Sequence, residues 1–417
     1  MLMRTFRCLS LLCGVLLLLP AWVQADDAQW LEFPGKAGPG KGKRIVLISG
    51  DEEYRSEEVM PQLGKMLSQS HGFDCTVLFA INPETGEVNP NQSDNIPGLQ
   101  RLQGADLMII ATRFRALPDE QMKYIVEYIE SGKPVIGLRT ATHAFNIPAG
   151  SKYAKYSWQH SGADYVQGFG RQVLGETWIS HHGKHGSEST RGLVADKSHP
   201  IATGIADGDI WGPTDVYEVR LPLPEGSQVI FLGAILQGMT PDAEVAQDKR
   251  NDPMMPIGWA RNYQGGRVFT STMGAATDLP SEGVRRMIVN ATYWCVGLDE
   301  AIQPDLNVDL VGDFKPTPFG FGTFVKGKRP ADFRETMHCR VLLFAAARDL
   351  AQSDALAVDV SPPVTAGAVL DAIARRCPHL APLLPVCRLA VDQSFVTADA
   401  AIPPGVELAL IPPVSGG

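Results

Sequence analysis

Histidine is concentrated in one part of the chain. Six of the nine histidines fall between residues 143 and 199, and three of these, His181, His182 and His185, stand within five residues. Two imidazoles four residues apart could share a metal only if the segment were helical. Gly183 favours a loop. We therefore expect solvated or hydrogen-bonded imidazoles first, a sugar or substrate site second and a metal third, and we predict no metal ligand.

A second group of polar residues follows a predicted buried strand. The sequence after residues 135–138 reads Arg139-Thr140-Ala141-Thr142-His143. It has no Cys and no Gly-x-Ser-x-Gly pattern, so a covalent Cys or Ser mechanism is not expected at this turn. A guanidinium, hydroxyls and an imidazole suit a hydroxylated or anionic small molecule, with Arg139 as donor and His143 as candidate base. Asp215 and Asp278 are candidate polar partners, although acidic side chains in loops are more often solvated.

The printed sequence ends in a segment with chemistry of its own, Pro412-Pro413-Val414-Ser415-Gly416-Gly417. Glycine has no Cβ, so an extended Gly-Gly tail can enter a channel that is too narrow for larger side chains. The two prolines lack amide donors and project such a tail away from the preceding strand. The reacting group would be the α-carboxylate of Gly417, which needs activation, and acyl-adenylate formation is the expected route.

The elements that position the first two groups alternate between strands and helices. Uninterrupted β-branched runs are typical of parallel strands covered on both faces, and the intervening apolar stripes have helical spacing. This alternation predicts a doubly wound α/β sheet, in which ligands bind beyond the carboxyl ends of the strands. Residues 304–330, rich in Pro and Gly, should form a wrapping tail or linker. We expect strands at 44–50, 75–79, 105–111 and 135–138, and helices at 57–70, from Pro118, and at 281–297.

The pattern restarts at Met337 as a second, smaller domain. Strand, strand, helix, strand, strand between residues 337 and 417 is a β-grasp plan, as in ubiquitin-like domains. The strands are expected at 338–345, 355–360, 388–393 and 406–411, and the helix at 365–376.

Composition excludes several classes of protein. The 44% hydrophobic and 20% charged residues exclude a wholly disordered chain and a multi-span membrane protein. The 37 Lys and Arg against 46 Asp and Glu give a net charge of −9, which argues against a general nucleic-acid binder. The seven Cys lack the paired spacing of a zinc site or a disulfide scaffold.

Residues 1–25 have the pattern of a secretory signal. Arg4 and Arg7 precede the apolar run 9–19, and Pro20 and Val23-Gln24-Ala25 follow it. We predict cleavage after Ala25 and export. The run is shorter than the roughly 20 residues that span a bilayer, so no stable membrane span is expected.

Segments 44–50, 137–145, 198–201, 214–217 and 256–269, with the His-rich stretch, together resemble the trehalose-utilisation (ThuA-like) family over residues 43–332. The resemblance implies a flavodoxin-like, class I glutamine-amidotransferase-like fold and a sugar ligand. It leaves open whether the domain is catalytic. Family members often carry Gly-His after the Arg-Val-Phe strand. Here Ala275 follows Gly274, so no role of that His is carried over.

Segments 344–350 and 390–393 and the Gly-Gly end resemble the small sulfur-carrier subunit of molybdopterin synthase (MoaD/ThiS-like) over residues 337–417. The resemblance implies that a ubiquitin-activating-type enzyme uses ATP to adenylate Gly417 and that sulfur then replaces AMP to give a thiocarboxylate. The Gly416-Gly417 end would enter the large synthase subunit to make the dithiolene of molybdopterin. No cofactor bound by the chain itself is implied.

The two ends of the chain point to different compartments. Export would carry Gly417 away from ATP and the cytoplasmic partners of a sulfur carrier. One alternative is a secreted ThuA-like sugar-binding or sugar-modifying protein with the tail as an interaction module only. Met337 is also a candidate start codon, so a fusion of two neighbouring reading frames is a further interpretation.

Overall fold

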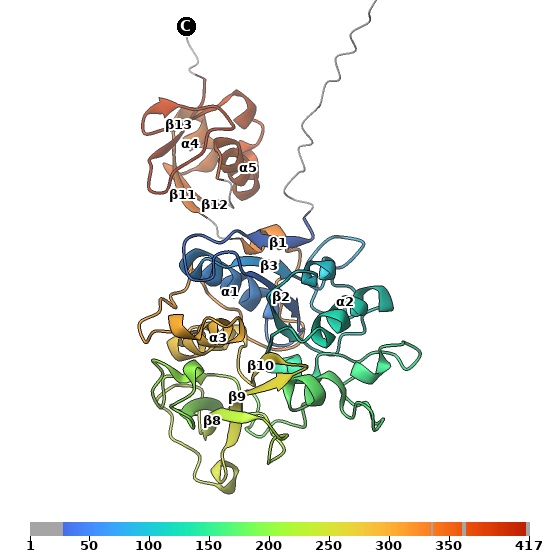
Figure 1. The fold of residues 1–417 in the computed structure, drawn as a ribbon. Coiled ribbons are helices and arrows are strands. Elements are labelled where there is room, and N and C mark those ends of the chain that lie inside the picture. Colours follow the sequence, from blue (N-terminus) through green and yellow to red (C-terminus); the bar gives the residue numbers. More distant parts are fainter. Residues whose placement is uncertain (1–27, 335–336, 361–363, 414–417) are drawn as a thin grey trace, which may run out of the picture.

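The computed structural model describes residues 28–334, 337–360 and 364–413. The predicted signal, 1–25, and the reactive end, Gly416 and Gly417, lie outside these described residues. The described chain forms two units, each with its own sheet and its own hydrophobic core (Figure 1). Within the described ranges, no helix has the length and apolar character needed to span a bilayer.

The larger unit is built on a ten-stranded mixed sheet with the order β1-β3-β2-β4-β5-β10-β9-β8-β6-β7. Strands β3, β2, β4, β5 and β10 are parallel, which confirms the predicted α/β class. β1 pairs antiparallel with β3, and β9, β8, β6 and β7 extend the other edge antiparallel. This second half was not predicted. The strands are β1 (Trp30–Phe33), β2 (Arg44–Gly50), β3 (Asp74–Leu78), β4 (Leu107–Thr112), β5 (Val135–Leu138), β6 (Ser189–Val194), β7 (Trp211–Gly212), β8 (Gln228–Leu236), β9 (Met255–Tyr263) and β10 (Gly266–Ser271).

Helices cover both faces of the parallel part. Because side chains alternate along a strand, Ile45 and Leu47 of β2 join one core, which α1 and α3 cover. Val46 and Ile48 join the opposite core, which α2 covers. A strand buried on both faces has to be apolar at every position, which is why these runs were recognisable. The helices are α1 (Ser56–His71), α2 (Asp119–Glu130) and α3 (Glu282–Cys295).

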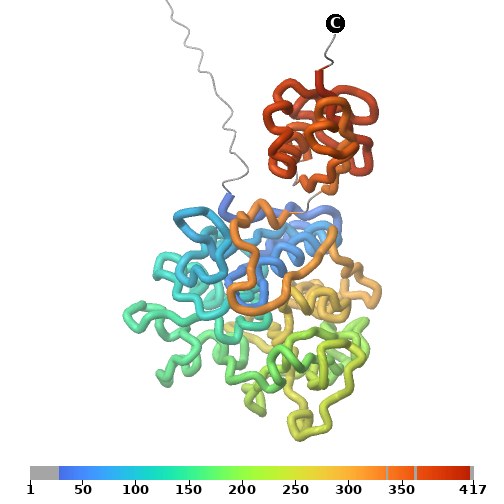
Figure 2. Tube along the Cα trace, turned by 180° about the vertical axis from the view of Figure 1, so that it is seen from behind, coloured from blue at the N-terminus to red at the C-terminus, as the bar shows by residue number. Residues whose placement is uncertain are grey.

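The segment after α3 wraps around the larger unit. Figure 2 shows it returning toward the amino-terminal strands and α1. The Thr317 amide donates to the Glu58 carboxylate at 2.9 Å, and the Val88 amide donates to the Lys328 carbonyl at 2.7 Å. Residues 304–330 therefore form the wrapping tail that the sequence predicted.

The last residue of α1 links this helix to α3. The His71 side chain is buried, its Nδ1 lies 2.9 Å from the Tyr293 hydroxyl, and the two rings meet edge to face. Burial lowers the pKa of His71 to about 4 from an ordinary value of 6.5. The folded state therefore holds this ring neutral, while the unfolded chain protonates it at higher pH.

The pH dependence of stability should show this difference. Between pH 6.5 and about 4 the unfolded chain binds more protons at His71, so unfolding free energy falls as pH decreases through that window, by up to about 3 kcal/mol. His71→Asn keeps a side chain that can hydrogen-bond to the Tyr293 hydroxyl but cannot be protonated, so the unfolding free energy of this variant should decline less steeply as pH falls. Equal slopes for the wild type and the variant would contradict this account.

The smaller unit is a β-grasp domain, as predicted. Its sheet has the order β12-β11-β15-β13-β14, and the central strands β11 and β15 are parallel. Val369 and Ile373 of α5 pack into the core. One short helix, α4, was not predicted. The strand expected at 338–345 ends at Leu343, and the helix begins two residues later, after Phe344. The elements are β11 (Met337–Leu343), α4 (Ala345–Ala351), β12 (Ala355–Val360), α5 (Ala366–Arg376), β13 (Arg388–Val391), β14 (Ser394–Phe395) and β15 (Leu408–Ile411).

Candidate functional site

The candidate site lies at the carboxyl ends of the parallel strands. β5 ends at Leu138 and the chain turns at once into a short 3-10 helix, Arg139–His143. Arg139 adopts a left-handed backbone conformation, with φ of 45°. This backbone conformation is energetically unfavourable for a residue with a side chain, and it directs the chain across the end of β5. There the Arg139 amide donates a hydrogen bond of 3.2 Å to the carbonyl of Met273, which follows β10. The turn that the sequence singled out therefore lies at the carboxyl end of β5, next to the segment that follows β10.

A buried ion pair forms the base of the site. The Arg139 guanidinium donates to the Asp215 carboxylate at 2.8 Å and to the Asp215 and Thr272 carbonyls at 2.7 Å each. The two ionised side chains are 1% and 0% exposed. The guanidinium carbon also lies 3.8 Å from the centre of the Tyr217 ring and 4.5 Å from that of Tyr54. Aromatic faces and carbonyls thus replace the water that Arg139 loses.

Two histidines converge on the same carboxylate. His181 Nδ1 lies 2.7 Å from Asp215 Oδ2, His185 Nδ1 lies 3.3 Å from Asp215 Oδ1, and the ring centres are 4.7 Å apart. Burial alone would raise the pKa of Asp215, but hydrogen bonds with His181 and His185 and the charge of Arg139 hold it well below its ordinary value. Hydrogen bonding to Asp215 raises the pKa of His185.

This convergence corrects the premise that His181 and His185 could share a metal only if the segment were helical, because their ring nitrogens come together on one carboxylate without a helix. The segment is a loop, and His181 is bridged antiparallel to Tyr217. Asp215 comes from a different part of the chain and anchors both rings. The prediction that acidic loop residues are solvated is also wrong for Asp215 and Asp278, which are 1% and 0% exposed.

The end of β2 supplies further side chains that sequence reasoning missed. Glu53 Oε1 lies 3.5 Å from His185 Nε2, and Glu53 Oε2 lies 3.4 Å from Arg113 Nε. Burial raises the pKa of Glu53. The Tyr54 hydroxyl accepts a hydrogen bond from Arg139 at 3.1 Å. Their position in the sequence could have revealed them, because they follow the first predicted strand of a doubly wound sheet, and ligands bind beyond the carboxyl ends of such strands.

His143 lies deeper than a solvent-exchanging base would. It is 2% exposed, and its Nδ1 lies 3.2 Å from the Thr142 hydroxyl. The ring contacts Phe114 and Trp178, with ring centres 4.9 and 5.3 Å away. Burial, with the charges of Arg113 and Arg139, lowers the pKa of His143. The more exposed His181 and His185 are better placed to exchange protons with a ligand.

Two of the predicted residues have structural contacts instead. His182 Nε2 lies 2.7 Å from the Arg250 carbonyl, so the ring is directed to a neighbouring loop. Asp278 accepts hydrogen bonds from the amides of Gly274 and Ala275 and from the Thr214 hydroxyl. Asp278 thus fixes the turn after β10, and the structure does not bring it or His182 into the His181–His185–Asp215 cluster.

The wrapping tail reaches the edge of the site. The Phe319 ring centre lies 5.6 Å from that of Tyr54 and 5.3 Å from that of His185. The Gly320 amide donates to the Glu53 carbonyl at 2.7 Å, and Arg55 donates to the Gly320 carbonyl at 2.8 Å. The segment from Phe319 to Gly320 therefore forms one wall beside the two imidazoles.

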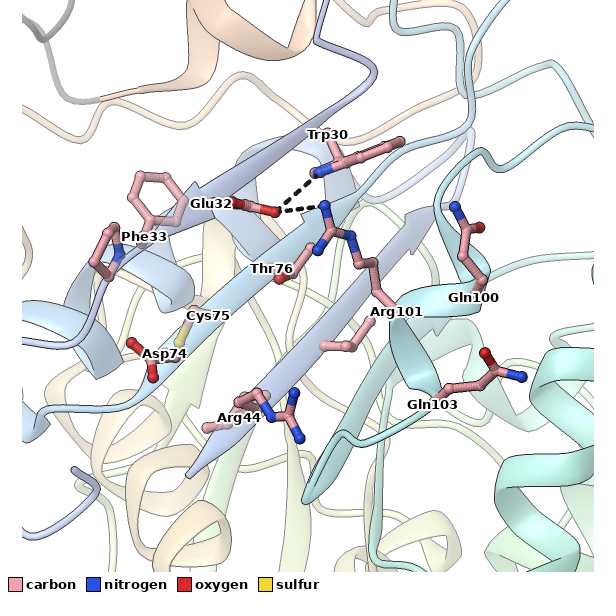
Figure 3. Close-up of a pocket in the computed structure, with 13 residues that line it drawn as sticks. Trp30, Glu32, Phe33, Arg44, Asp74, Cys75, Thr76, Gln100, Arg101 and Gln103 are labelled. Carbon is pink, nitrogen blue, oxygen red and sulfur yellow. Dashed lines mark hydrogen bonds and ion pairs between the residues drawn. The ribbon is translucent and has the colours of Figure 1, made fainter. Parts of the chain in front are cut away.

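Two cavities differ in their relation to this site. One of about 440 Å³ is lined by Trp158, Trp178, Gln167 and Arg220, and the Trp178 ring lies 5.9 Å from that of His181. The other, of about 580 Å³, lies at the amino ends of β2 and β3, where Glu32 binds Trp30 and Arg101 (Figure 3). Of these two cavities, the first has a lining residue, Trp178, whose ring contacts a member of the polar cluster at the carboxyl ends.

Comparison with known proteins identifies both units. The model of the ThuA family, described as "Trehalose utilisation", matches residues 44–295. The chain belongs to this family. The model of the ThiS family matches residues 341–417. The molybdopterin synthase sulfur carrier subunit of Arabidopsis thaliana is 32% identical over 90 residues, which are 22% of this chain and 94% of that protein. The ThuA-family chain therefore ends in a sulfur-carrier-type domain.

Solved structures similar to parts of the chain fall into the same two groups. SAMP1 from Haloferax volcanii is 31% identical, over 19% of this chain and 99% of that one, with a TM-score of 0.18. A putative ThuA-like protein from Parabacteroides merdae is 14% identical, over 61% and 90% of the two chains, with a TM-score of 0.40. Another from Bacteroides uniformis is also 14% identical, over 66% and 100%, with a TM-score of 0.37.

Proposed function

We propose that the β-grasp domain carries sulfur for molybdopterin synthesis as a thiocarboxylate on Gly417. The observation that carries the proposal is the position of β15. This strand lies between β11 and β13 in the sheet, ends at Ile411, and is followed by Pro412 and Pro413. A strand that is hydrogen-bonded to a neighbour on each side is a rigid base for a tail. The two prolines lack amide donors, so the tail cannot continue the backbone hydrogen bonds of the sheet.

The chemistry on Gly417 requires an adenylating partner. Its carboxylate attacks ATP to form an acyl-adenylate and releases pyrophosphate, and a sulfur nucleophile then displaces AMP. The thiocarboxylate would next enter the large subunit of molybdopterin synthase. Because ATP and both partners are cytoplasmic in this scheme, the sulfur-carrying form is cytoplasmic.

An apolar patch supports docking of the large subunit. The strand register places Phe395 opposite Ala390, and Ala390 opposite Ala409, so all three lie on one face of the sheet. Phe395 is 59% exposed, and Arg388 lies over its ring. Aromatic residues and arginines often contribute most of the binding free energy of a protein–protein interface.

Replacing the exposed aromatic residue should weaken this docking. Phe395→Asp places a charge in the apolar patch and should reduce affinity for the purified large subunit at least about 30-fold in a titration. Phe321→Asp is the matched control, because Phe321 is 61% exposed in the larger unit and should leave affinity unchanged. Equal affinities for the two variants would contradict the docking surface. Docking without sulfur transfer would make the tail an interaction module only.

The ThuA unit would bind a sugar in the cavity beside the His181–His185–Asp215 cluster. Two indoles with polar neighbours suit a sugar, which has apolar C–H faces and hydroxyl edges. The indole N–H of Trp178 is buried and has no hydrogen-bond partner among the described residues, so it is available to a ligand hydroxyl. Arg220, which pairs with Glu176 at 2.7 Å, adds a charged donor at the rim.

Calorimetric titration with trehalose and with glucose tests this site. Trp178→Ala should weaken binding at least about tenfold, because it removes both the stacking face and the N–H donor. Trp30→Ala, in the cavity at the amino ends of the strands, is the matched control and should bind as the wild type does. A wild-type protein that binds neither sugar, or equal affinities of the two variants, would overturn the proposal.

A further inference from the structure

The His181–His185–Asp215 cluster has the donor set of a metal centre. One ligand atom from each residue lies within 4.8 Å of the other two. Two imidazoles and a carboxylate form a common protein ligand set for zinc and other first-row transition ions. Ligands bound about 2.1 Å from an ion stand about 3 to 3.5 Å from each other. His185 Nδ1 lies 3.3 Å from Asp215 Oδ1, within this range, and His181 Nδ1 lies 2.7 Å from Asp215 Oδ2, slightly below it.

We propose that these three residues bind one divalent transition-metal ion, with Zn²⁺ as the reference ion. Asp215 Oδ1 already accepts the Arg139 guanidinium at 2.8 Å, so Oδ2, which lies 2.7 Å from His181 Nδ1, is the oxygen left for the ion. His185 Nδ1 now lies 3.3 Å from Oδ1 of the same carboxylate. His181 Nδ1 and His185 Nδ1 complete the set. Binding would replace the protons that now lie between the imidazoles and the carboxylate. The proposal does not rest on the sugar or sulfur-carrier functions.

Neighbouring groups hold the ligands in position. Glu53 Oε1 is 3.5 Å from His185 Nε2, the ring nitrogen that would face away from the ion. A carboxylate on the distal nitrogen is a recurring outer partner of metal-bound histidine, because it fixes the ring and increases its basicity. Glu53 and Asp215 also offset the charges of Arg113 and Arg139, with which they pair.

The site is open on one side. Asp215 is fully buried, whereas the His181 and His185 side chains are 33% and 36% exposed. An ion with three protein ligands therefore keeps a solvent-facing position for water or a ligand oxygen. This arrangement distinguishes reactive metal centres from closed structural ones. A hydroxylated or carbonyl-bearing ligand is the chemical class that such a position would take.

The test uses the full chain, freed of any tag, stripped with a chelator and titrated with Zn²⁺ in a calorimeter. We expect one ion per chain at this site. His181→Ala and His185→Ala should each weaken Zn²⁺ binding at least about 100-fold, because each removes a direct ligand. His182→Ala is the matched control and should bind as the wild type does, since His182 is directed to the Arg250 carbonyl.

Cysteine ligation is the main competing source of a signal, because Cys377 and Cys387 are free and partly exposed. The Co²⁺-loaded protein distinguishes the two, since thiolate ligands give an intense near-ultraviolet charge-transfer band and nitrogen and oxygen ligands do not. We expect no such band. The His181→Ala/His185→Ala double variant should keep the thermal midpoint of the chelator-treated wild type. Undiminished Zn²⁺ binding by a folded double variant, or no binding by the wild type, would overturn the proposal.

Discussion

Addition of one alanine after Gly417 is expected to reduce molybdopterin formation by this chain to background. The α-carboxylate would then lie one residue further out, on a residue with a Cβ, so the channel that admits Gly-Gly no longer accepts the reacting end. The measurement is a reconstituted assay with the adenylating enzyme, ATP, a sulfur donor and the large synthase subunit. The β-grasp fold should be unaffected, because the core lies between Met337 and Ile411.

Ser415→Ala is the matched control for this extension. It changes the same tail without lengthening it and keeps Gly417 at the end, and it should retain most of the activity. Both variants should bind the large subunit, since the Phe395 patch is unchanged. Wild-type molybdopterin formation by the extended chain would show that the terminal carboxylate is not the reacting group.

Asp215→Ala is expected to destabilise the larger unit by about 3 to 5 kcal/mol. It leaves the Arg139 guanidinium buried without its carboxylate, and an uncompensated buried charge is costly. Urea unfolding followed by tryptophan fluorescence measures this, because no tryptophan lies in residues 337–417 and six of the seven, from Trp30 to Trp294, lie in the larger unit. The same variant should lose Zn²⁺ binding.

Asp248→Ala is the control, because it removes an ion pair at the surface instead of a buried one. Asp248 pairs with Arg250 at 2.7 Å, but its side chain is 43% exposed and water screens the pair, so its loss should cost far less than the loss of Asp215. Adding Arg139→Met to Asp215→Ala should recover part of the stability, because both buried charges are then gone. A destabilisation by Asp215→Ala no larger than that by Asp248→Ala would contradict the buried-pair account.

The parallel strands were predictable because their burial leaves a continuous apolar signal. The strand at 135–138 was predicted with its observed bounds, and the turn predicted after it begins at Arg139. The β-grasp strands at 355–360 and 388–391 were also recognised, the second within two residues. In both units the residues that face the core are apolar, so their spacing in the sequence predicts the strands and helices that carry them.

The antiparallel half of the sheet left no comparable signal. β6 reads Ser-Thr-Arg-Gly-Leu-Val and lies near the edge of the sheet, so its polarity does not alternate clearly. β8 pairs with β9 through an irregular register around Phe231, which breaks the period on which strand prediction depends. β6 and β8 were not predicted, and β9 was quoted only as part of the motif 256–269.

The site could be located from sequence but not assembled. Arg139 and Asp215 are 76 residues apart, and His181 and Asp215 are 34 apart. The residues next to Asp215 in the sequence do not show whether its carboxylate is solvated or buried. They therefore could not predict that this carboxylate contacts one guanidinium and two imidazoles. The same limit applies to Phe319, which belongs to a segment with little periodicity but packs against Tyr54.

Intact-mass analysis of the native protein, with fragmentation of its carboxyl-terminal peptide, tests the central claim most directly. The account predicts a chain that ends at Gly417, with a fraction about 16 Da heavier because sulfur has replaced one oxygen of the terminal carboxylate. The same spectrum reports whether that fraction retains residues 1–25. A native chain that ends at another residue, or one that never gains this mass in cells making molybdopterin, would contradict it.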